Sequence, residues 1–303
     1  MAGSVNVLDE AHGQKFAAYR ADCIDFLRQM PDDSIGMSIY SPPFSDLFVY
    51  SSSIADMGNS SSNGEFAEHY RFCAEELLRV TKPGRWVAVH CSDLPVRKWV
   101  EGHVALYPFS DEISRIHAEA GWLFHCRITI RRDPVIEMQR TKALGLLYKQ
   151  LQKDSAMSRV GMADYVMVFR KPGDNAEPVG HKPADFPVDL WQQWAEPVWM
   201  DIDQTKTLNA RLARENDDER HLCPLQLDLI ERAIVLSSNP GDTVFSPFMG
   251  IGSEGVVALQ LGRRFIGTEL KDSYFRIAER NLHDAEKRAS MPTLLDLMEG
   301  TAA

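Results

Sequence analysis

The sequence predicts an α/β fold in which a mostly parallel sheet carries helices on both faces. Short apolar runs rich in β-branched residues alternate with longer segments whose apolar residues recur at helical spacing. Glycine or proline closes most of these segments, as expected where a strand or helix ends. Strands that alternate with helices along a chain typically lie together in one sheet that the helices cover.

The first half of the chain begins this alternation. Residues 35–40 are an apolar run that stops at Ser41-Pro-Pro-Phe44, so they are expected to form a buried strand, because paired prolines cannot continue a central strand. Residues 51–64 are rich in Ser, Asn and Gly, which predicts a mobile loop that could be a lid or a plain linker. Residues 65–80 are expected to be a helix that Lys82-Pro83-Gly84 ends.

The following elements continue the pattern. We expect strands at 85–90, 122–130 and 164–169, and a helix at 113–121. From 171 to about 220 the chain is rich in proline, and Trp191, Trp194 and Trp199 punctuate it. These tryptophans are expected to pack a small module. Residues 171–215 are therefore expected to be an irregular connector or a small inserted module.

Regular alternation resumes near residue 225. Helices are expected at 225–236, 253–261 and 272–288, strands at 243–245 and 264–268, and a glycine-bearing turn at 248–252. The chain thus divides into 1–170, the connector, a second half at 216–290 that completes the same domain, and a frayed tail at 291–303.

Composition limits the class of protein. With 303 residues, 44% hydrophobic and 25% charged, the chain can hold one large α/β domain or two small ones. Its five cysteines form no Cys-x-x-Cys pair, so reduced thiols are expected and no metal site is. No signal-like or membrane-length apolar run is present, which predicts a cytoplasmic protein without membrane contact.

The charge distribution matters more than the net charge. The total of −10 counts against nucleic-acid binding, which usually leaves a basic footprint. Residues 127–159, however, hold eight basic and three acidic side chains, a net of +5. This segment is a candidate phosphate-contacting face, with a solvated helix surface as the alternative.

A glycine turn follows the predicted strand at 243–245. It reads Ser246-Pro247-Phe248-Met-Gly250-Ile-Gly252-Ser253, and Glu269 stands 19 residues after Gly250 at the end of the next strand. Glycines permit close backbone approach to a ligand, and an acid at this distance suits ribose hydroxyls. The turn lacks the full Gly-x-Gly-x-x-Gly fingerprint. Alone, it would suit a nicotinamide dehydrogenase, a methyltransferase or a tight structural turn.

A second candidate site is Ser41-Pro42-Pro43-Phe44. Two prolines make the backbone rigid and leave carbonyl groups free as acceptors. Together with the Ser41 hydroxyl they could accept hydrogen bonds from an amino group, while Phe44 offers a flat face for a planar base. Its place at the end of a strand is where ligands bind in open α/β sheets.

Taken together, the two motifs resemble those of the amino-methylating (N4-cytosine/N6-adenine) DNA methyltransferases. The likeness covers roughly residues 16–170 and 215–283. It is similar to the permuted, beta-class-like arrangement, in which the catalytic motif precedes the cofactor motif, and to phage and prophage members of the family. It implies a class I S-adenosylmethionine-dependent methyltransferase fold with a mostly parallel seven-stranded sheet.

The resemblance assigns roles residue by residue. The family's catalytic motif matches Ser41, Pro42, Pro43 and Phe44. Its cofactor-binding positions match Asp22, Cys23, His221, Pro224, Ser246, Pro247, Phe248, Gly250, Gly252, Ser253 and Glu269. One departure is Ser246, which stands where the family usually has an Asp that helps to hold the cofactor.

The implied activity is direct transfer of a methyl group from S-adenosylmethionine to the exocyclic amino group of a flipped base in double-stranded DNA. Cys91 is expected to be structural, since no covalent enzyme–base bond is needed. Ser at the first catalytic position favours cytosine N4 over adenine N6. Sequence recognition is expected in 133–160 and 172–215, so that 171–215 would be a small target-recognition insert if it is not an irregular connector. Packing of its three tryptophans is favoured over insertion near DNA, and a homodimer stays open. The alternatives are a catalytically silent DNA-binding module and an amino-methyltransferase that acts on RNA or protein.

Overall fold

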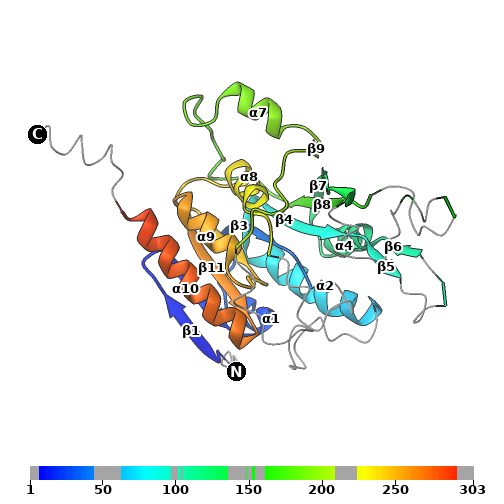
Figure 1. The fold of residues 1–303 in the computed structure, drawn as a ribbon. Coiled ribbons are helices and arrows are strands. Elements are labelled where there is room, and N and C mark those ends of the chain that lie inside the picture. The colour runs from blue at the N-terminus through cyan, green and yellow to red at the C-terminus, as the bar shows by residue number, and fades with distance from the viewer. Residues whose placement is uncertain are drawn as a thin grey trace, which may run out of the picture.

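The computed structural model describes residues 7–43, 63–96, 102–103, 105–135, 148, 152–153, 161–208 and 224–291. Among these residues, no helix is both long and apolar enough to cross a membrane. Figure 1 shows the arrangement of the elements.

A nine-stranded sheet forms the centre of the molecule, in the order β1-β2-β11-β10-β3-β4-β8-β7-β9. The strands are β1 (Asp9–His12), β2 (Phe16–Arg20), β3 (Ile35–Tyr40), β4 (Thr81–Ser92), β7 (Leu123–Ile130), β8 (Asp164–Arg170), β9 (Val198–Trp199), β10 (Thr243–Ser246) and β11 (Arg264–Glu269). The five strands from β2 to β4 run parallel to one another, whereas β8 is antiparallel to β4 and to β7.

This architecture confirms the predicted fold class. The predicted number of seven strands holds for the segment of the sheet from β2 to β7, but the sheet has one further strand at each edge. β1 folds back on β2 as an antiparallel hairpin, and the two-residue β9 pairs with the end of β7. Neither edge strand has a sequence signal, because one is short and mostly exposed and the other is only two residues long.

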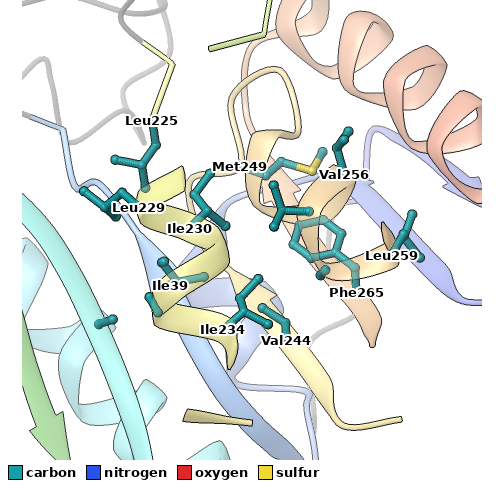
Figure 2. Close-up of a cluster of buried hydrophobic side chains, with 14 of the residues drawn as sticks. Ile39, Leu225, Leu229, Ile230, Ile234, Val244, Met249, Val256, Leu259 and Phe265 are labelled. Atoms are coloured by element: carbon teal, nitrogen blue, oxygen red, sulfur yellow. The ribbon is translucent and has the colours of Figure 1, made fainter. Parts of the chain in front are cut away.

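Helices cover the two faces of the sheet (Figure 1). On one face lie α8 (Leu227–Ser237), α9 (Ser253–Gln260) and α10 (Asp272–Ala289), and on the other lie α1 (Cys23–Leu27), α2 (Asn63–Val80) and α4 (Phe109–Glu119). The core under α8 and α9 includes Ile230, Ile234, Met249, Val256 and Phe265 (Figure 2). Alternate residues of β3 and β10 enter the two cores, as the pleat of a doubly covered sheet requires.

The regular elements predicted from periodicity are present with small shifts. β4 shows the largest shift, because it starts at Thr81 directly after α2 rather than at residue 85. Of the predicted loop at 51–64, residues 51–62 lie outside the described residues and 63–64 begin α2. The predicted tail after 291 also lies outside them. The hairpin of β5 (Leu94–Val96) and β6 (Ala105–Tyr107) was not predicted, and neither were β1, β2 and α1.

The described part of the 171–215 segment packs against α8. It contains the short helix α7 (Val188–Trp194) and β9. Arg232 of α8 lies over the rings of Trp194 and Trp199, 5.4 Å and 5.1 Å from their centroids, and bonds Asp201 at 2.6 Å. Trp199 is buried in the core, whereas Trp191 is 53% exposed. Two of the three tryptophans therefore pack and the third faces outward.

Candidate functional site

The two predicted motifs lie at adjacent strand ends. β3 and β10 are parallel neighbours with Ser38 opposite Phe245, so the turns that follow them leave the same edge of the sheet. The Tyr40 and Phe248 rings meet edge to face with centroids 5.7 Å apart. Ser41, Pro42 and Pro43 thus follow a strand end beside the glycine turn, where ligands bind in open α/β sheets. Phe44 lies outside the described residues.

Tyr40 holds the end of β3, directly before the Ser41-Pro42-Pro43 turn. Its hydroxyl group lies 2.9 Å from that of Tyr70 of α2, and both side chains are fully buried. Burial raises the pKa of both phenols well above the usual value, so both remain neutral. The pair fixes the end of β3 without placing a charge beneath the site.

Ser41 begins a chain of polar contacts that the sequence did not reveal. Its Oγ lies 2.8 Å from Nδ1 of His90 on β4. His90 Nε2 lies 3.5 Å from Asp164 Oδ2, and Asp164 Oδ1 accepts from Arg132 at 3.1 Å. His90 and Asp164 are 8% and 4% exposed, so their interaction is shielded from water.

The chain of contacts has a preferred direction. The Asp164 carboxylate favours the imidazole tautomer that carries its proton on Nε2. His90 Nδ1 is then an acceptor, and the Ser41 hydroxyl donates to it. The Ser41 oxygen consequently keeps lone pairs with which it can accept a hydrogen bond from an amino group.

Cys91 follows His90 on β4 and packs in the core beneath α2 and α4. It is fully buried, and burial followed by the nearby Asp164 carboxylate raises the pKa of its thiol far above the usual range. A neutral thiol in an apolar core is a poor nucleophile. The geometry agrees with a structural role for Cys91.

The glycine turn is held open toward the strand ends. Gly250 and Gly252 adopt positive φ values of 51° and 85°, which glycine reaches without strain. A Cβ atom at Gly252 would lie 3.3 Å from Ala278 of α10, whereas one at Gly250 would meet nothing within 4 Å. The close packing at Gly252 and the open space at Gly250 suit a turn that a ligand approaches on one side. Pro247 is fixed by its carbonyl, which accepts from the buried Thr268 hydroxyl at 2.8 Å.

Glu269 closes this turn from the neighbouring strand. Its Oε2 accepts from the Gly250 N–H at 3.0 Å and its Oε1 accepts from the Lys271 N–H at 2.8 Å. The carboxylate therefore stands beside the glycine turn, where ribose hydroxyls would need an acceptor. Ser253, the first residue of α9, is buried beneath the turn.

Ser246 ends β10 with its hydroxyl group buried. It is 0% exposed, and its Oγ has no hydrogen-bond partner in the described part of the chain. A buried hydroxyl without a partner is costly, so a partner supplied by a ligand would relieve it. The structure thus offers a hydroxyl donor where the related family usually has a carboxylate.

The remaining predicted cofactor residues lie at the same sheet edge or outside the described residues. Asp22 follows β2 and caps α1, accepting from the Ile24 and Asp25 N–H groups at 2.9 Å each. Burial raises the pKa of Asp22, and a hydrogen bond with Cys73, followed by burial, raises that of Cys23. The Cys23 side chain packs in the core, so its thiol is not turned toward the strand ends.

Pro224 precedes α8, the helix that packs on the glycine-turn side of the sheet. His221 lies outside the described residues. Three further residues were missed by sequence reasoning, namely His90, Asp164 and Glu254. None of the three had a clear local signal, and an acid in the first turn of a helix, such as Glu254, is common.

The chain is similar to known proteins over most of its length. The family described as DNA methylase (N6_N4_Mtase) matches residues 35–280. The type II methyltransferase M1.MboII of Moraxella bovis is 26% identical over 288 residues, covering 88% of this chain and 96% of its own length. M.BamHI of Bacillus amyloliquefaciens is 26% identical over 258 residues, which are 83% of this chain and 54% of its own.

Solved structures share the fold. The cytosine-N4-specific PvuII DNA methyltransferase superposes with a TM-score of 0.64 at 17% identity, covering 94% of this chain and 96% of its own. The Thermus thermophilus protein TTHA0409, solved with S-adenosyl-L-methionine, gives a TM-score of 0.64 at 20% identity and covers 87% of this chain and 91% of its own. The chain uses S-adenosylmethionine as its cofactor, and it belongs to the N6/N4 DNA methylase family.

Proposed function

We propose that the chain methylates the exocyclic N4 amino group of a cytosine flipped out of duplex DNA. The observation that carries the proposal is the hydrogen bond between Ser41 and His90, 2.8 Å long. It occupies the proton of the Ser41 hydroxyl and leaves the oxygen as an acceptor for an N–H of the substrate amine. Cytosine is favoured because a neutral hydroxyl stands at the first catalytic position, and the PvuII enzyme that shares this fold is cytosine-N4-specific.

The residues of the chain do the positioning. When bound, the cofactor supplies a methyl group on a sulfonium. Ser41 Oγ and the carbonyl of Pro42 hold the two amine hydrogens and so direct the nitrogen lone pair toward the glycine turn. Phe44 stacks on the base in this arrangement. No covalent bond to the protein is needed, in keeping with the buried, neutral Cys91.

Base flipping is supported by the surroundings of the catalytic turn. Ser41 contacts the buried His90, which in turn approaches the buried Asp164, at the edge of the sheet between neighbouring strand ends. An amino group inside a duplex is paired and stacked, and it cannot reach such a position. Extrusion costs about a few kcal/mol, which DNA contacts must offset.

The segments at 133–160 and 172–215 recognise the DNA sequence in this proposal. Trp191 of α7 is exposed, and Arg127 and Arg131 lie on or directly after β7, the strand that pairs with β9. Exposed aromatic rings and exposed arginines are side chains that suit contact with DNA. Replacing Trp191 by Ala should weaken specific DNA binding while S-adenosylmethionine binding stays unchanged.

The test is a methylation assay with identification of the product. Purified protein should transfer labelled methyl from S-adenosylmethionine to unmethylated DNA, and Ser41→Ala or Phe44→Ala should lower transfer at least about tenfold. Sequencing of DNA from expressing cells, with detection of both N4-methylcytosine and N6-methyladenine, identifies the base. N6-methyladenine alone would contradict the cytosine assignment, and normal transfer by both variants would contradict the catalytic one.

A further inference from the structure

Glu254 is a buried carboxyl group that the proposed reaction does not use. It is the second residue of α9, directly after the glycine turn, and it is 4% exposed. Its side chain makes no hydrogen bond or ion pair with another residue of the described segments, and it bonds only its own backbone N–H. A buried acid without a partner is costly unless something else completes it.

Two buried polar atoms without hydrogen-bond partners in the described chain lie on elements that adjoin α9. They are Ser246 Oγ, at the end of β10, and Gln226 Oε1, at the start of α8, neither of which has a hydrogen bond within the described chain. Ser246 points to the face of the sheet that α8 and α9 cover, since it alternates with Val244 of that core. α8 packs against the glycine turn there, with Ile230 beside Met249 (Figure 2).

These three groups belong to one region of the fold, where β10, α8 and α9 meet. An acid and an amide oxygen accept hydrogen bonds, and a hydroxyl can donate one. That set fits a ligand end that carries both a cation with several N–H donors and an anion. The amino-acid end of S-adenosylmethionine, with its α-ammonium and α-carboxylate, has this chemistry.

We propose that Glu254 binds the α-ammonium group of the methionine portion of the cofactor, assisted by Gln226 Oε1. The Ser246 hydroxyl then donates to the α-carboxylate. The acid also offsets the positive end of α9, which would otherwise repel a cationic ligand. In this way the chain supplies from α9 the carboxylate that it lacks at the end of β10.

Binding of an ammonium group at this position should be coupled to the protonation of Glu254. Without ligand, burial and then the Glu269 carboxylate raise the pKa of Glu254 to about 8, so the group is mostly protonated at pH 7. An ammonium group placed beside Glu254 would favour its ionised form, so ligand binding should release a proton.

Several other charged groups on elements packed against α9 form ion pairs of their own. Those on or beside α8 and α10 form the pairs Lys206–Asp228, Arg232–Asp201, Arg20–Asp272 and Arg276–Asp272, and Lys206 also lies near Glu231. Glu269 is therefore the charged group whose field on Glu254 matters most.

Calorimetry in buffers of different ionisation enthalpy tests this directly. S-adenosylhomocysteine has the ammonium but no sulfonium, and its binding at pH 7 should release about one proton. 5′-Methylthioadenosine lacks the amino-acid end and should release none. Glu254→Gln should abolish the release and weaken S-adenosylhomocysteine binding roughly tenfold to hundredfold at a pH of about 8.5. Glu196→Gln, at an exposed position, should leave both unchanged.

Three results would overturn the assignment. They are no proton release by the wild type, equal release by Glu254→Gln, and release by S-adenosylmethionine alone, which would place the sulfonium at Glu254. The comparison of the two ligands on the wild-type protein remains decisive if Glu254→Gln does not fold. Because cofactor binding is measured without DNA, the outcome is independent of which base is methylated.

Discussion

The Ser41 hydroxyl can accept a hydrogen bond from an amine most readily if its own proton points elsewhere. His90 Nδ1, 2.8 Å away, can accept that proton, and the Asp164 carboxylate, 3.5 Å from His90 Nε2, favours the tautomer that allows it. In the proposed reaction His90 is therefore a positioning residue, since its ring acts through Ser41. Arg132 holds the other oxygen of Asp164 and completes the chain of contacts.

Replacement of His90 tests this role. In His90→Ala the Ser41 hydroxyl is free to rotate and donate toward the substrate, so kcat should fall about tenfold or more, which corresponds to a lost net hydrogen bond. Asn offers an acceptor near the Nδ1 position and should restore part of kcat. Single-turnover methylation measures the effect, with His125→Ala as a control at an exposed position on β7. Equal rates for His90→Ala and His90→Asn would contradict the positioning role.

The raised pKa of Glu254 also predicts how the unfolding free energy of the cofactor-free protein depends on pH. Its pKa of about 8 in the folded protein lies above the ordinary value of 4.5, so the folded state retains a proton that the unfolded state releases. Unfolding free energy should therefore fall as pH rises from about 5 to about 8, by at most about 1.4 kcal/mol per pH unit. Chemical denaturation at several pH values measures this, and Glu254→Gln should flatten the profile. A wild-type profile as flat as that of the variant would refute the effect.

At the scale of elements, two separate features at the start of α9 favour glycine: a positive φ and close packing against α10. Gly252 has a φ of 85° and lies against Ala278, so a side chain there meets both backbone strain and α10. Gly262, which follows the end of the same helix with a φ of 75°, faces open space. A comparison of substitutions at the two glycines therefore distinguishes the cost of a positive φ from the effect of disturbing the glycine turn.

Alanine at both positions should cost about 1–2 kcal/mol of unfolding free energy, because L-residues are strained at positive φ. Gly252→Ala should in addition weaken S-adenosylmethionine binding at least about tenfold, since the contact with α10 must displace the turn. Gly262→Ala should bind the cofactor normally. Thermal unfolding and calorimetry measure the two effects, and normal binding by Gly252→Ala would show that the turn tolerates the shift.

The elements also show how far sequence reasoning reaches. The Ser41-Pro42-Pro43 turn and the glycine turn were predictable because prolines and glycines that follow a strand indicate a turn locally. The parallel pairing of β3 and β10 then brings the two turns together. His90 and Asp164 were not predictable. They meet because β8 returns antiparallel to β4, with Ser92 opposite Asp164, and nothing local in either segment indicates that register.

At the scale of the whole molecule, the candidate site and a buried ion pair lie at opposite ends of the parallel strands. The site follows the carboxyl ends of β3, β10 and β11, whereas Arg85 of β4 pairs with Asp242 just before β10 begins. Arg85 is 0% exposed, and Asp242 also accepts from the Asn239 N–H at 2.6 Å. This buried pair joins β4 to the turn before β10 and so helps to fix the two halves of the sheet.

Breaking that pair should damage stability and leave catalysis intact. Arg85→Met leaves the Asp242 carboxylate buried without its partner, so unfolding free energy should fall by about 3–5 kcal/mol. Lys82 lies on the same strand as Arg85 and forms a more exposed pair with Glu177. Lys82→Met removes this pair and should cost about 0–1 kcal/mol of unfolding free energy. Denaturant titration measures both changes, and methylation assays below the unfolding transition should give wild-type kcat for both variants. A lowered kcat in folded Arg85→Met would mean that strain at the amino ends of the strands is transmitted across the sheet to Ser41.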